Sequence, residues 1–581
     1  MNFNATLKIL PGAGWLISEP DINNIHFPEN QDADNAVLQK KCKEFLRDHV
    51  MPFIDEIDDA GRTRMPPLLK RAGKESLLAI SIPVKWGGLG KNFIDAGIAT
   101  ETLGAGNSFS VAYAAHTGIG LLPILYFGNE WQRQKYLPSL CSGEYLGAYA
   151  LTEPNSGSDA MAASTTASLS DDQKYYLLNG QKCWITNGGF ADIFTVFAKI
   201  KGDNEQQGQE RLSAFIVEKN FEGFTQGPDE KKMGIKGSST TALYFDNCKV
   251  PVSNLLGEAG KGHIIAFNIL NIGRLKLAQF NLGAIKYSFQ KMVDQLPVLV
   301  SNAGILEYYI VRTAVNIFTS EASIYRTASL IQNMQPIGDK DDQHILLKAA
   351  EEYAIECAMM KIYASELMNE TVDAVYNIYA ENVVPGISDV LRNLLDARIN
   401  RIYEGTNEIN RIFMMTTLAK RFNSGRLTWN NEVNFSSLNS EGLMAPEKNL
   451  IQKSKQLFIE IFELSLKTFG HQFSHQQEII TCLSNIFTQI FHMESAILRV
   501  IAFKKMQDKE LFEHYAEMAR YFLYQSIDSI YKNGKDCLLA FLTGEILQQQ
   551  LEKWVALESS VDFSLHKSAK KIFSYLKINH S

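Results

Sequence analysis

The chain has 581 residues, of which 45% are hydrophobic and 21% charged, and its formal net charge is −7 at pH 7. This length exceeds one ordinary hydrophobic core, so we expect several domains. The acidic balance argues against nucleic-acid binding, and no apolar run approaches the length of a membrane-spanning helix. Seven cysteines stand singly, without a CxxC motif, which favours reduced thiols in the cytoplasm over a disulfide framework.

Helix-spaced apolar residues over 35–53, 93–104 and 131–140 predict an N-terminal α-helical domain over residues 1–148. The spacing of apolar residues then changes from helical to strand-like, and a compact central β-domain, rather than a parallel sheet, is predicted over residues 149–257. Its β-branched and aromatic runs are 175–178, 192–199, 212–218 and 242–245, and Asn179-Gly180 is predicted to form a hairpin turn.

Helical spacing returns at residue 262 and predicts a C-terminal helical bundle over residues 258–422. The polar stretch 423–448 is typical of a linker. Long amphipathic runs follow and predict an additional helical domain over residues 430–581. Its apolar faces are too broad to remain in water, so we expect it to pack on the preceding domains.

Two segments around the start of the β-domain have the composition of a cofactor site. In residues 149–160 (YALTEPNSGSDA), Gly157 allows the backbone to approach a planar ring or a phosphate closely, although a plain surface turn has the same composition. In residues 182–189 (KCWITNGG), Trp184 suits either stacking beside an aromatic cofactor or filling the core.

Two later segments contribute polar side chains. In residues 401–411 (RIYEGTNEINR), Glu404 lies on a break of small residues, where a carboxylate can point into a cavity. In residues 267–274 (FNILNIGR), Asn271 and Arg274 stand one helical turn apart, and the arginine suits either a carbonyl or phosphate ligand or a solvated helix face.

The order and spacing of YALTEPNSGSDA, WITNGG and YEGTNEI resemble the acyl-CoA dehydrogenase family over residues 35–421. FNILNIGR, KKMGIKGSSTTALYFDN and the extension beyond residue 430 resemble its very-long-chain subgroup. The resemblance implies an α+β multidomain fold: an N-terminal helical domain, a central β-domain and a C-terminal helical bundle, plus an extra C-terminal helical domain.

The resemblance also implies roles for individual residues. Glu404 matches the catalytic base, and Gly273 occupies the position at which some branches of the family place the base, so Glu404 is the sole candidate. The positions that match substrate contacts are Ser158, Asn271, Gly273, Arg274 and Gly405. Those that match contacts with FAD are Tyr149, Leu151, Thr152, Gly157, Ser158, Trp184, Ile185, Thr186, Thr406, Asn407 and Glu408.

The implied reaction converts an acyl-CoA thioester, of long chain in this subgroup, to the trans-2-enoyl-CoA in fatty-acid β-oxidation. Glu404 would take the α proton and FAD the β hydride. The implied partners are an electron-transfer flavoprotein and a second copy of the chain. The expected location is cytoplasmic, and peripheral membrane association, which some members of the family have, is the alternative. An acyl-CoA oxidase and a non-catalytic assembly homologue with weakened FAD binding are the alternative functions.

Two segments depart from the family pattern. Residues 293–304 (VDQLPVLVSNAG) lack its Arg-x-Gln-Phe-Gly motif, and residues 376–382 (YNIYAEN) lack its Gly-Gly turn. In the family both elements hold the adenine and pyrophosphate end of FAD across a dimer interface. Separately, His471 and His475 with Glu478 have the spacing of metal ligands on a helix, but no further ligand motif accompanies them, and we expect no metal.

Overall fold

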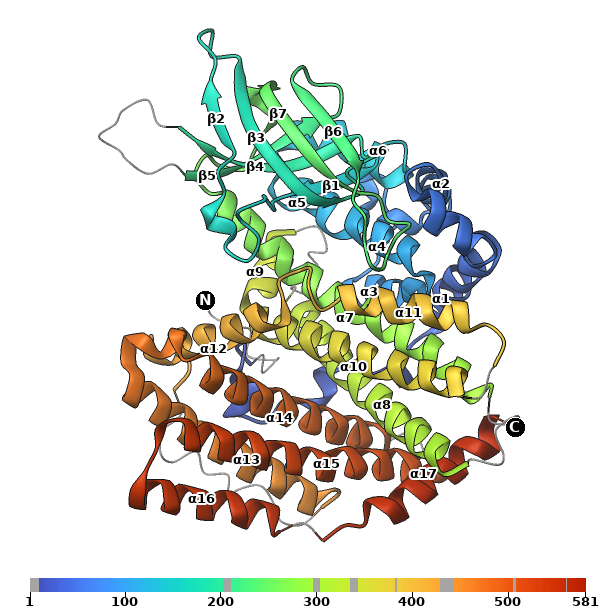
Figure 1. Cartoon of the computed structure of the whole chain (residues 1–581), viewed down its shortest axis with the longest axis vertical. Coiled ribbons are helices and arrows are strands. Elements are labelled where there is room, and N and C mark those ends of the chain that lie inside the picture. Colours follow the sequence, from blue (N-terminus) through green and yellow to red (C-terminus); the bar gives the residue numbers. More distant parts are fainter. Residues whose placement is uncertain are drawn as a thin grey trace.

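The computed structural model describes residues 10–201, 211–295, 303–334, 343–381, 384–428, 442–504, 508–560 and 562–580. A β-sheet lies at one end of the molecule, additional C-terminal helices lie at the other, and a helical bundle lies between them (Figure 1). This order of helical, β, helical and helical parts confirms the expected fold. The domain boundaries at residues 148, 257, 422 and 430 remain predictions.

The N-terminal part is helical, and three of its helices begin at side-chain caps. Asp32 accepts a hydrogen bond from the Asn35 N–H, and Asn92 and Asn129 cap later helices in the same way. One π-helical turn, Ala115–Gly120, separates α4 from α5. The helices are α1 (Ala33–Phe45), α2 (Ile54–Lys74), α3 (Phe93–Leu103), α4 (Ser108–Ala114), α5 (Leu122–Phe127) and α6 (Glu130–Ser142).

The β-domain is one eight-stranded sheet with the order β6-β7-β3-β2-β4-β5-β8, in which β1 pairs with β4. The pairs β1–β4 and β2–β4 are parallel and the others antiparallel. The strands are β1 (Gly147–Ala150), β2 (Thr166–Leu169), β3 (Tyr175–Thr186), β4 (Ile193–Ile200), β5 (Arg211–Glu218), β6 (Phe224–Asp229), β7 (Thr240–Pro251) and β8 (Leu255–Leu256).

The predicted hairpin turn at Asn179-Gly180 is wrong. Both residues lie inside β3, where the register against β7 shifts between Leu178 and Gly180. Asn179 accepts a hydrogen bond from the Asn247 N–H at 2.9 Å, and a Cβ on Gly180 would lie 2.7 Å from the Thr165 hydroxyl oxygen. The Asn-Gly pair therefore forms a β-bulge that allows a close approach of backbones.

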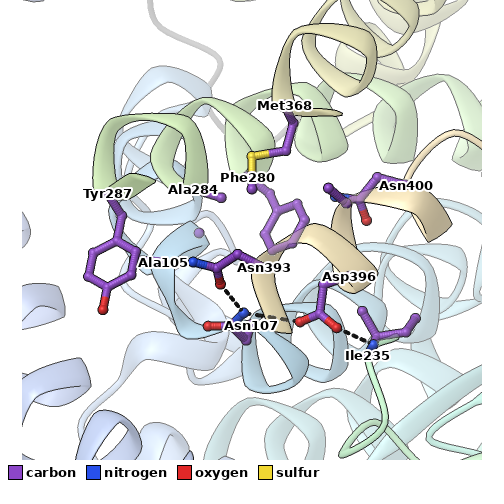
Figure 2. A pocket seen from close by; sticks show the side chains of 12 residues that line it. Ala105, Asn107, Ile235, Phe280, Ala284, Tyr287, Met368, Asn393, Asp396 and Asn400 are labelled. Carbon is purple, nitrogen blue, oxygen red and sulfur yellow. Dashed lines mark hydrogen bonds between the residues drawn. The ribbon is translucent and has the colours of Figure 1, made fainter. Parts of the chain in front are cut away.

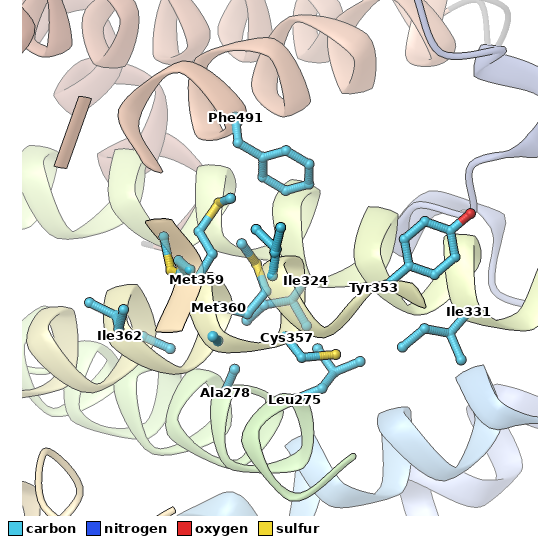
Figure 3. Close-up of a cluster of buried hydrophobic side chains, with 14 of the residues drawn as sticks. Leu275, Ala278, Ile324, Ile331, Tyr353, Cys357, Met359, Met360, Ile362 and Phe491 are labelled. Carbon is cyan, nitrogen blue, oxygen red and sulfur yellow. The ribbon is translucent and has the colours of Figure 1, made fainter. Parts of the chain in front are cut away.

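The central bundle is built on two long helices, α7 (Gly262–Val293) and α10 (Ala354–Glu381), which pack along each other. Figure 3 shows the core where they meet α8 and the C-terminal extension, with Leu275, Ile324, Met359 and Phe491 in one buried cluster. The remaining helices of the bundle are α8 (Ala303–Asn333), α9 (Gln343–Glu352), α11 (Ile387–Ile399) and α12 (Asn407–Asn423).

The C-terminal extension forms a helical layer against this bundle, which confirms its expected packing (Figure 1). Within it, α14 contacts both α8 and α12. The helices are α13 (Ala445–Phe469), α14 (Gln477–Phe503), α15 (Lys509–Phe541), α16 (Gly544–Glu558) and α17 (Leu565–His580). The predicted linker 423–448 lies partly outside the described residues.

Two helical stretches, Ser108–Phe127 and α14, are long and apolar enough to cross a membrane, so the expectation that no apolar run approaches that length is wrong. Their most apolar windows are 89% and 78% buried inside the protein. Packing against neighbouring helices accounts for apolar residues on all sides of a buried helix.

Buried charges join the extension to the bundle. Glu494 on α14 accepts hydrogen bonds from Arg326 Nη2 on α8 at 2.7 Å and from Lys455 Nζ on α13 at 2.5 Å. Lys455 also donates to the Trp15 carbonyl at 2.5 Å, and the buried Trp15 ring packs on Phe487 of α14. The N-terminal segment therefore lies between the bundle and the extension.

We expect Glu494→Gln to lower the free energy of unfolding by about 3–5 kcal/mol, because it removes the charge that balances two buried cations. Thermal unfolding followed by circular dichroism measures the change. The matched control is Glu460→Gln, which breaks a partly exposed pair with Lys553 and should cost at most about 1 kcal/mol. Equal effects of the two substitutions would contradict the structural role of the buried cluster.

Candidate active site

The loop between α11 and α12 holds Glu404 in an uncommon backbone conformation. Glu404 has a φ of 59° and Gly405 a φ of 82°. A non-glycine residue in this region is strained and is held there by its surroundings. Thr406 follows as the N-cap of α12, and its hydroxyl accepts a hydrogen bond from the Ile409 N–H at 3.2 Å. This turn directs the Glu404 side chain away from α12 and toward α7.

The Glu404 carboxyl group is enclosed, although the residue as a whole is partly exposed. Its Oε2 is buried and has no hydrogen-bond partner among the described residues. A Cβ on Gly273 of α7 would lie 2.8 Å from this oxygen. Burial raises the pKa of Glu404 to about 7, against the opposing effect of the positive charges of Arg274 and Lys361. A carboxylate with this pKa is suited to proton abstraction near neutral pH.

Three side chains hold the loop by its carbonyl groups. Arg274 Nε donates to the Glu404 carbonyl at 3.3 Å. Lys361 Nζ on α10 and Asn410 Nδ2 on α12 donate to the Gly405 carbonyl at 2.7 and 2.9 Å. Sequence reasoning did not identify Lys361 or Asn410, and only the position of Asn410 inside the YEGTNEINR segment hinted at its role.

The structure removes one of the two interpretations of Arg274. The residue is buried, so it is not a solvated helix charge. Its Nη1 donates to Asn271 Oδ1 at 3.0 Å, and its guanidinium lies over the Phe413 ring at 4.8 Å. Asn271 and Arg274 therefore brace the loop, and their predicted contact with substrate remains a prediction.

Asn407 and Glu408 lie on different sides of α12. The Asn407 amide is buried against α10, where its Oδ1 accepts from Lys361 Nζ at 2.7 Å and its Nδ2 donates to Ser365 Oγ at 3.0 Å. Glu408 is exposed in the first turn of α12. Their contacts with the cofactor remain predictions.

Trp184 lies on a second bulge of β3, at the register shift between Lys182 and Ile185. Its φ is 57° and its side chain is 56% exposed, so it does not fill the core. Ile185 is buried, and Thr186 lines the same cavity as Glu404 and Gly273. An exposed indole beside this cavity is a suitable platform for a flat ring.

The loop 149–160 combines an anchored start with an open end. Tyr149 and Leu151 are buried, and the Tyr149 hydroxyl donates to the Ala266 carbonyl on α7 at 3.4 Å. The Thr152 carbonyl accepts from the Cys183 N–H at 3.0 Å. Gly157 and Ser158 are exposed, and a Cβ on Gly157 would meet nothing within 4 Å. The open end leaves space for a ring or a phosphate.

A buried ion pair that sequence reasoning missed holds this loop. Glu153 accepts from Lys182 Nζ on β3 at 2.7 Å and from the N–H groups of Ser164 and Thr165 at 2.6 and 3.0 Å. Burial alone would raise the pKa of Glu153, but Lys182 and these hydrogen bonds lower it to about 2. The loop and the Trp184 strand are thereby tied together.

An apolar cavity extends from the Glu404 carboxyl group between α7 and the α4–α5 region. Small residues of the π-helical turn, among them Ala115 and Gly118, line this cavity and leave space in it. Lys276 of α7 is the positively charged residue among those that line the cavity. Its Nζ donates to the Thr117 carbonyl of the π-helical turn at 3.1 Å. The lining residues are Val111, Ala114, Ala115, Gly118, Ile119, Thr186, Gly273, Lys276, Leu277, Phe280, Tyr403 and Glu404.

These features fit a flavin as the cofactor. The exposed indole of Trp184, the open space at Gly157 and the unpartnered Oε2 of Glu404 leave room for a planar ring and an acyl group. Of the two divergent segments, residues 296–302 lie outside the described residues. Tyr376–Glu381 form the last turns of α10, so a helix stands where the family has a Gly-Gly turn.

The histidine pair is exposed in a 3₁₀ segment, Gly470–His475. Among the described residues, no group of three or more His, Cys, Asp or Glu side chains could hold a metal ion.

Family models match the chain in the order of its domains. They are described as acyl-CoA dehydrogenase N-terminal domain (residues 32–144), middle domain (148–248) and C-terminal domain (260–419), with a further acyl-CoA dehydrogenase C-terminal domain over 453–554. A probable acyl-CoA dehydrogenase of Bacillus subtilis (strain 168) is 38% identical over 562 residues, which are 93% of each chain.

Two further proteins support the same assignment. A crystal structure of an acyl-CoA dehydrogenase complexed with FAD from Bacillus anthracis has a TM-score of 0.92 and 33% identity, and the alignment covers 98% of this chain and 99% of that one. The mitochondrial very long-chain specific acyl-CoA dehydrogenase of Bos taurus is 37% identical over 399 residues, which are 65% of this chain and 58% of the bovine one.

The fold and the site define an FAD-dependent oxidoreductase. The chain belongs to the acyl-CoA dehydrogenase family and carries the additional C-terminal helical domain.

We expect kcat/KM to rise with pH through a midpoint near 7, because Glu404 must be deprotonated to accept a proton and burial raises its pKa to about 7. Lys361→Met should move the midpoint to higher pH, since it removes a positive charge that lowers this pKa. The measurement is a pH profile of acyl-CoA oxidation for both proteins. A midpoint near the usual pKa of a carboxyl group would contradict the assignment.

We expect Gly273→Ala to lower kcat by about tenfold to a hundredfold, because the new methyl group would displace the Glu404 carboxyl from its position. The FAD absorbance spectrum and the melting temperature should stay close to those of the unsubstituted protein. Unchanged turnover would show that Glu404 does not act from beside Gly273.

Proposed function

We propose that this acyl-CoA dehydrogenase removes hydrogen from the α and β carbons of a fatty acyl-CoA thioester and releases the trans-2-enoyl-CoA in β-oxidation. Glu404 is the base that takes the α proton. The observation that carries the proposal is the buried, unpartnered Glu404 carboxyl oxygen facing the apolar cavity beside Gly273.

Glu404 also supplies a hydrogen-bond donor. Among the described residues its backbone N–H donates to no other group, so it is available to a thioester carbonyl placed at the mouth of the cavity. A donor at this position stabilises the negative charge that develops on the carbonyl oxygen as the α proton leaves. Arg274, Lys361 and Asn410 keep the donor and the carboxyl group in a fixed relation by holding the loop carbonyls.

We assign the flavin ring to the space bounded by Trp184, Thr186 and the open end of the loop 149–160. When bound there, FAD supplies the hydride acceptor for the β carbon. The strand bulge at Trp184 and the Glu153–Lys182 ion pair orient this half of the site. The apolar walls of the cavity exclude water from the carboxyl group and keep its pKa raised.

The partners follow from the same proposal. We propose an electron-transfer flavoprotein as electron acceptor and a homodimer as the working assembly, both supported by the family resemblance. A cytoplasmic location is supported by the seven cysteines, all of which are free thiols. Peroxide release with oxygen consumption during turnover would instead identify an acyl-CoA oxidase.

We expect Glu404→Gln to retain the yellow cofactor but to lose bleaching of the flavin absorbance by acyl-CoA, with kcat reduced at least about a hundredfold. The control is Glu370→Gln, which alters an exposed carboxylate on α10 paired with Arg312 and should leave turnover unchanged. Substantial turnover by Glu404→Gln would rule out Glu404 as the base. Purified protein that is colourless and takes up no added FAD would favour a non-catalytic homologue.

A further inference from the structure

One face of α7 begins at Gly273, beside the Glu404 carboxyl group, and continues into the interior of the bundle. Gly273, Leu277, Phe280 and Ala284 recur at the helical spacing that places side chains in one line. Gly273, Leu277 and Phe280 line the cavity that contains Glu404, which we call the proximal cavity. Phe280 and Ala284 line a second cavity farther along the helix, which we call the distal cavity.

Phe280 is the one residue that lines both cavities. Its side chain is buried and packs in a cluster with Val111, Ile235 and Leu277. Figure 2 shows the Phe280 ring between α7 and the polar side chains of α11, on the side of the distal cavity. The ring therefore forms a partition between the two spaces.

The distal cavity has a polar floor. Asn107 Nδ2 donates to Asn393 Oδ1 at 2.7 Å and to Asp396 Oδ2 at 3.0 Å, and Asp396 also accepts from the Ile235 N–H. Asn400 lies on the same wall (Figure 2). Such a floor binds the end of an alkyl chain less favourably than the mainly apolar lining of the proximal cavity does.

We propose that Phe280 ends the acyl-binding cavity and makes this enzyme selective for medium-chain acyl groups. The inference rests on the proposed function of Glu404. Phe280 lies two helical turns beyond Gly273, or about 10 Å along the axis at about 1.5 Å per residue. A zigzag chain with carbon–carbon bonds of about 1.5 Å covers that length in roughly eight bonds. This chain length is shorter than the one favoured by the resemblance to the very-long-chain subgroup.

The experiment measures kcat/KM for butyryl-, octanoyl- and palmitoyl-CoA with the FAD-loaded enzyme. The unsubstituted protein should prefer octanoyl-CoA to palmitoyl-CoA. Phe280→Ala joins the two cavities and should raise the ratio of palmitoyl-CoA to octanoyl-CoA activity by about tenfold or more. Phe280→Leu provides a smaller change in volume and should shift the ratio in the same direction.

Two further variants test the direction of the chain along α7. Leu277→Phe moves the obstruction one turn toward Glu404 and should shift the preference to butyryl-CoA. Ala284→Phe fills the distal cavity and should leave the profile of the unsubstituted protein unchanged, but it should cancel the gain when combined with Phe280→Ala.

The outcomes separate the inference from the function on which it rests. A preference for palmitoyl-CoA in the unsubstituted protein, with no change in Phe280→Ala, Phe280→Leu or Leu277→Phe, would overturn the role of Phe280 and leave the dehydrogenase activity intact. Absence of oxidation of every acyl-CoA tested would overturn the proposed function and the inference together.

Discussion

The placement of one carboxyl group against one glycine governs the architecture of the site. Glu404 stands on a left-handed backbone turn, and its Oε2 approaches the position where a side chain on Gly273 would begin. A methyl group there or an unstrained turn would move the carboxyl group out of the cavity. The strain of the turn is tolerated because Arg274, Lys361 and Asn410 bond the carbonyls of the loop.

The same arrangement sets the electrostatics of the base. Burial raises the pKa of Glu404 and two nearby cations lower it, so the pKa of about 7 results from the balance of these two effects. Burial also lowers the pKa of Lys361 to about 7, which weakens the charge that opposes protonation of the base. Proton affinity at Glu404 therefore depends on how dry the cavity is, and an acyl chain that fills the cavity increases it.

The helices could be predicted from their apolar spacing. The Glu404 turn, the loop 149–160 and the Trp184 strand were each ambiguous from their own residues, and only their order along the chain, through the family resemblance, predicted that they form one site. Partners distant in sequence were not visible: Lys361, which holds the Glu404 loop, and the Glu153–Lys182 pair carry no local signature. The hairpin turn predicted at Asn179-Gly180 was wrong because these residues form a bulge in β3 where it pairs with β7. No local sequence pattern shows this pairing.

The C-terminal extension also bears on the site, through α12. Arg411 Nε on α12 donates to Asn485 Oδ1 on α14 at 3.2 Å, and the Ser484 hydroxyl donates to the Arg411 carbonyl at 3.2 Å. Arg411 follows Asn410 directly, and Asn410 holds the carbonyls of the Glu404 loop. The helix that carries this support is thus fixed on one side by α10 and on the other by α14. Because the buried cluster at Glu494 anchors α14 to α8, the added domain contributes to the rigidity of the catalytic turn without lining the cavity among the described residues.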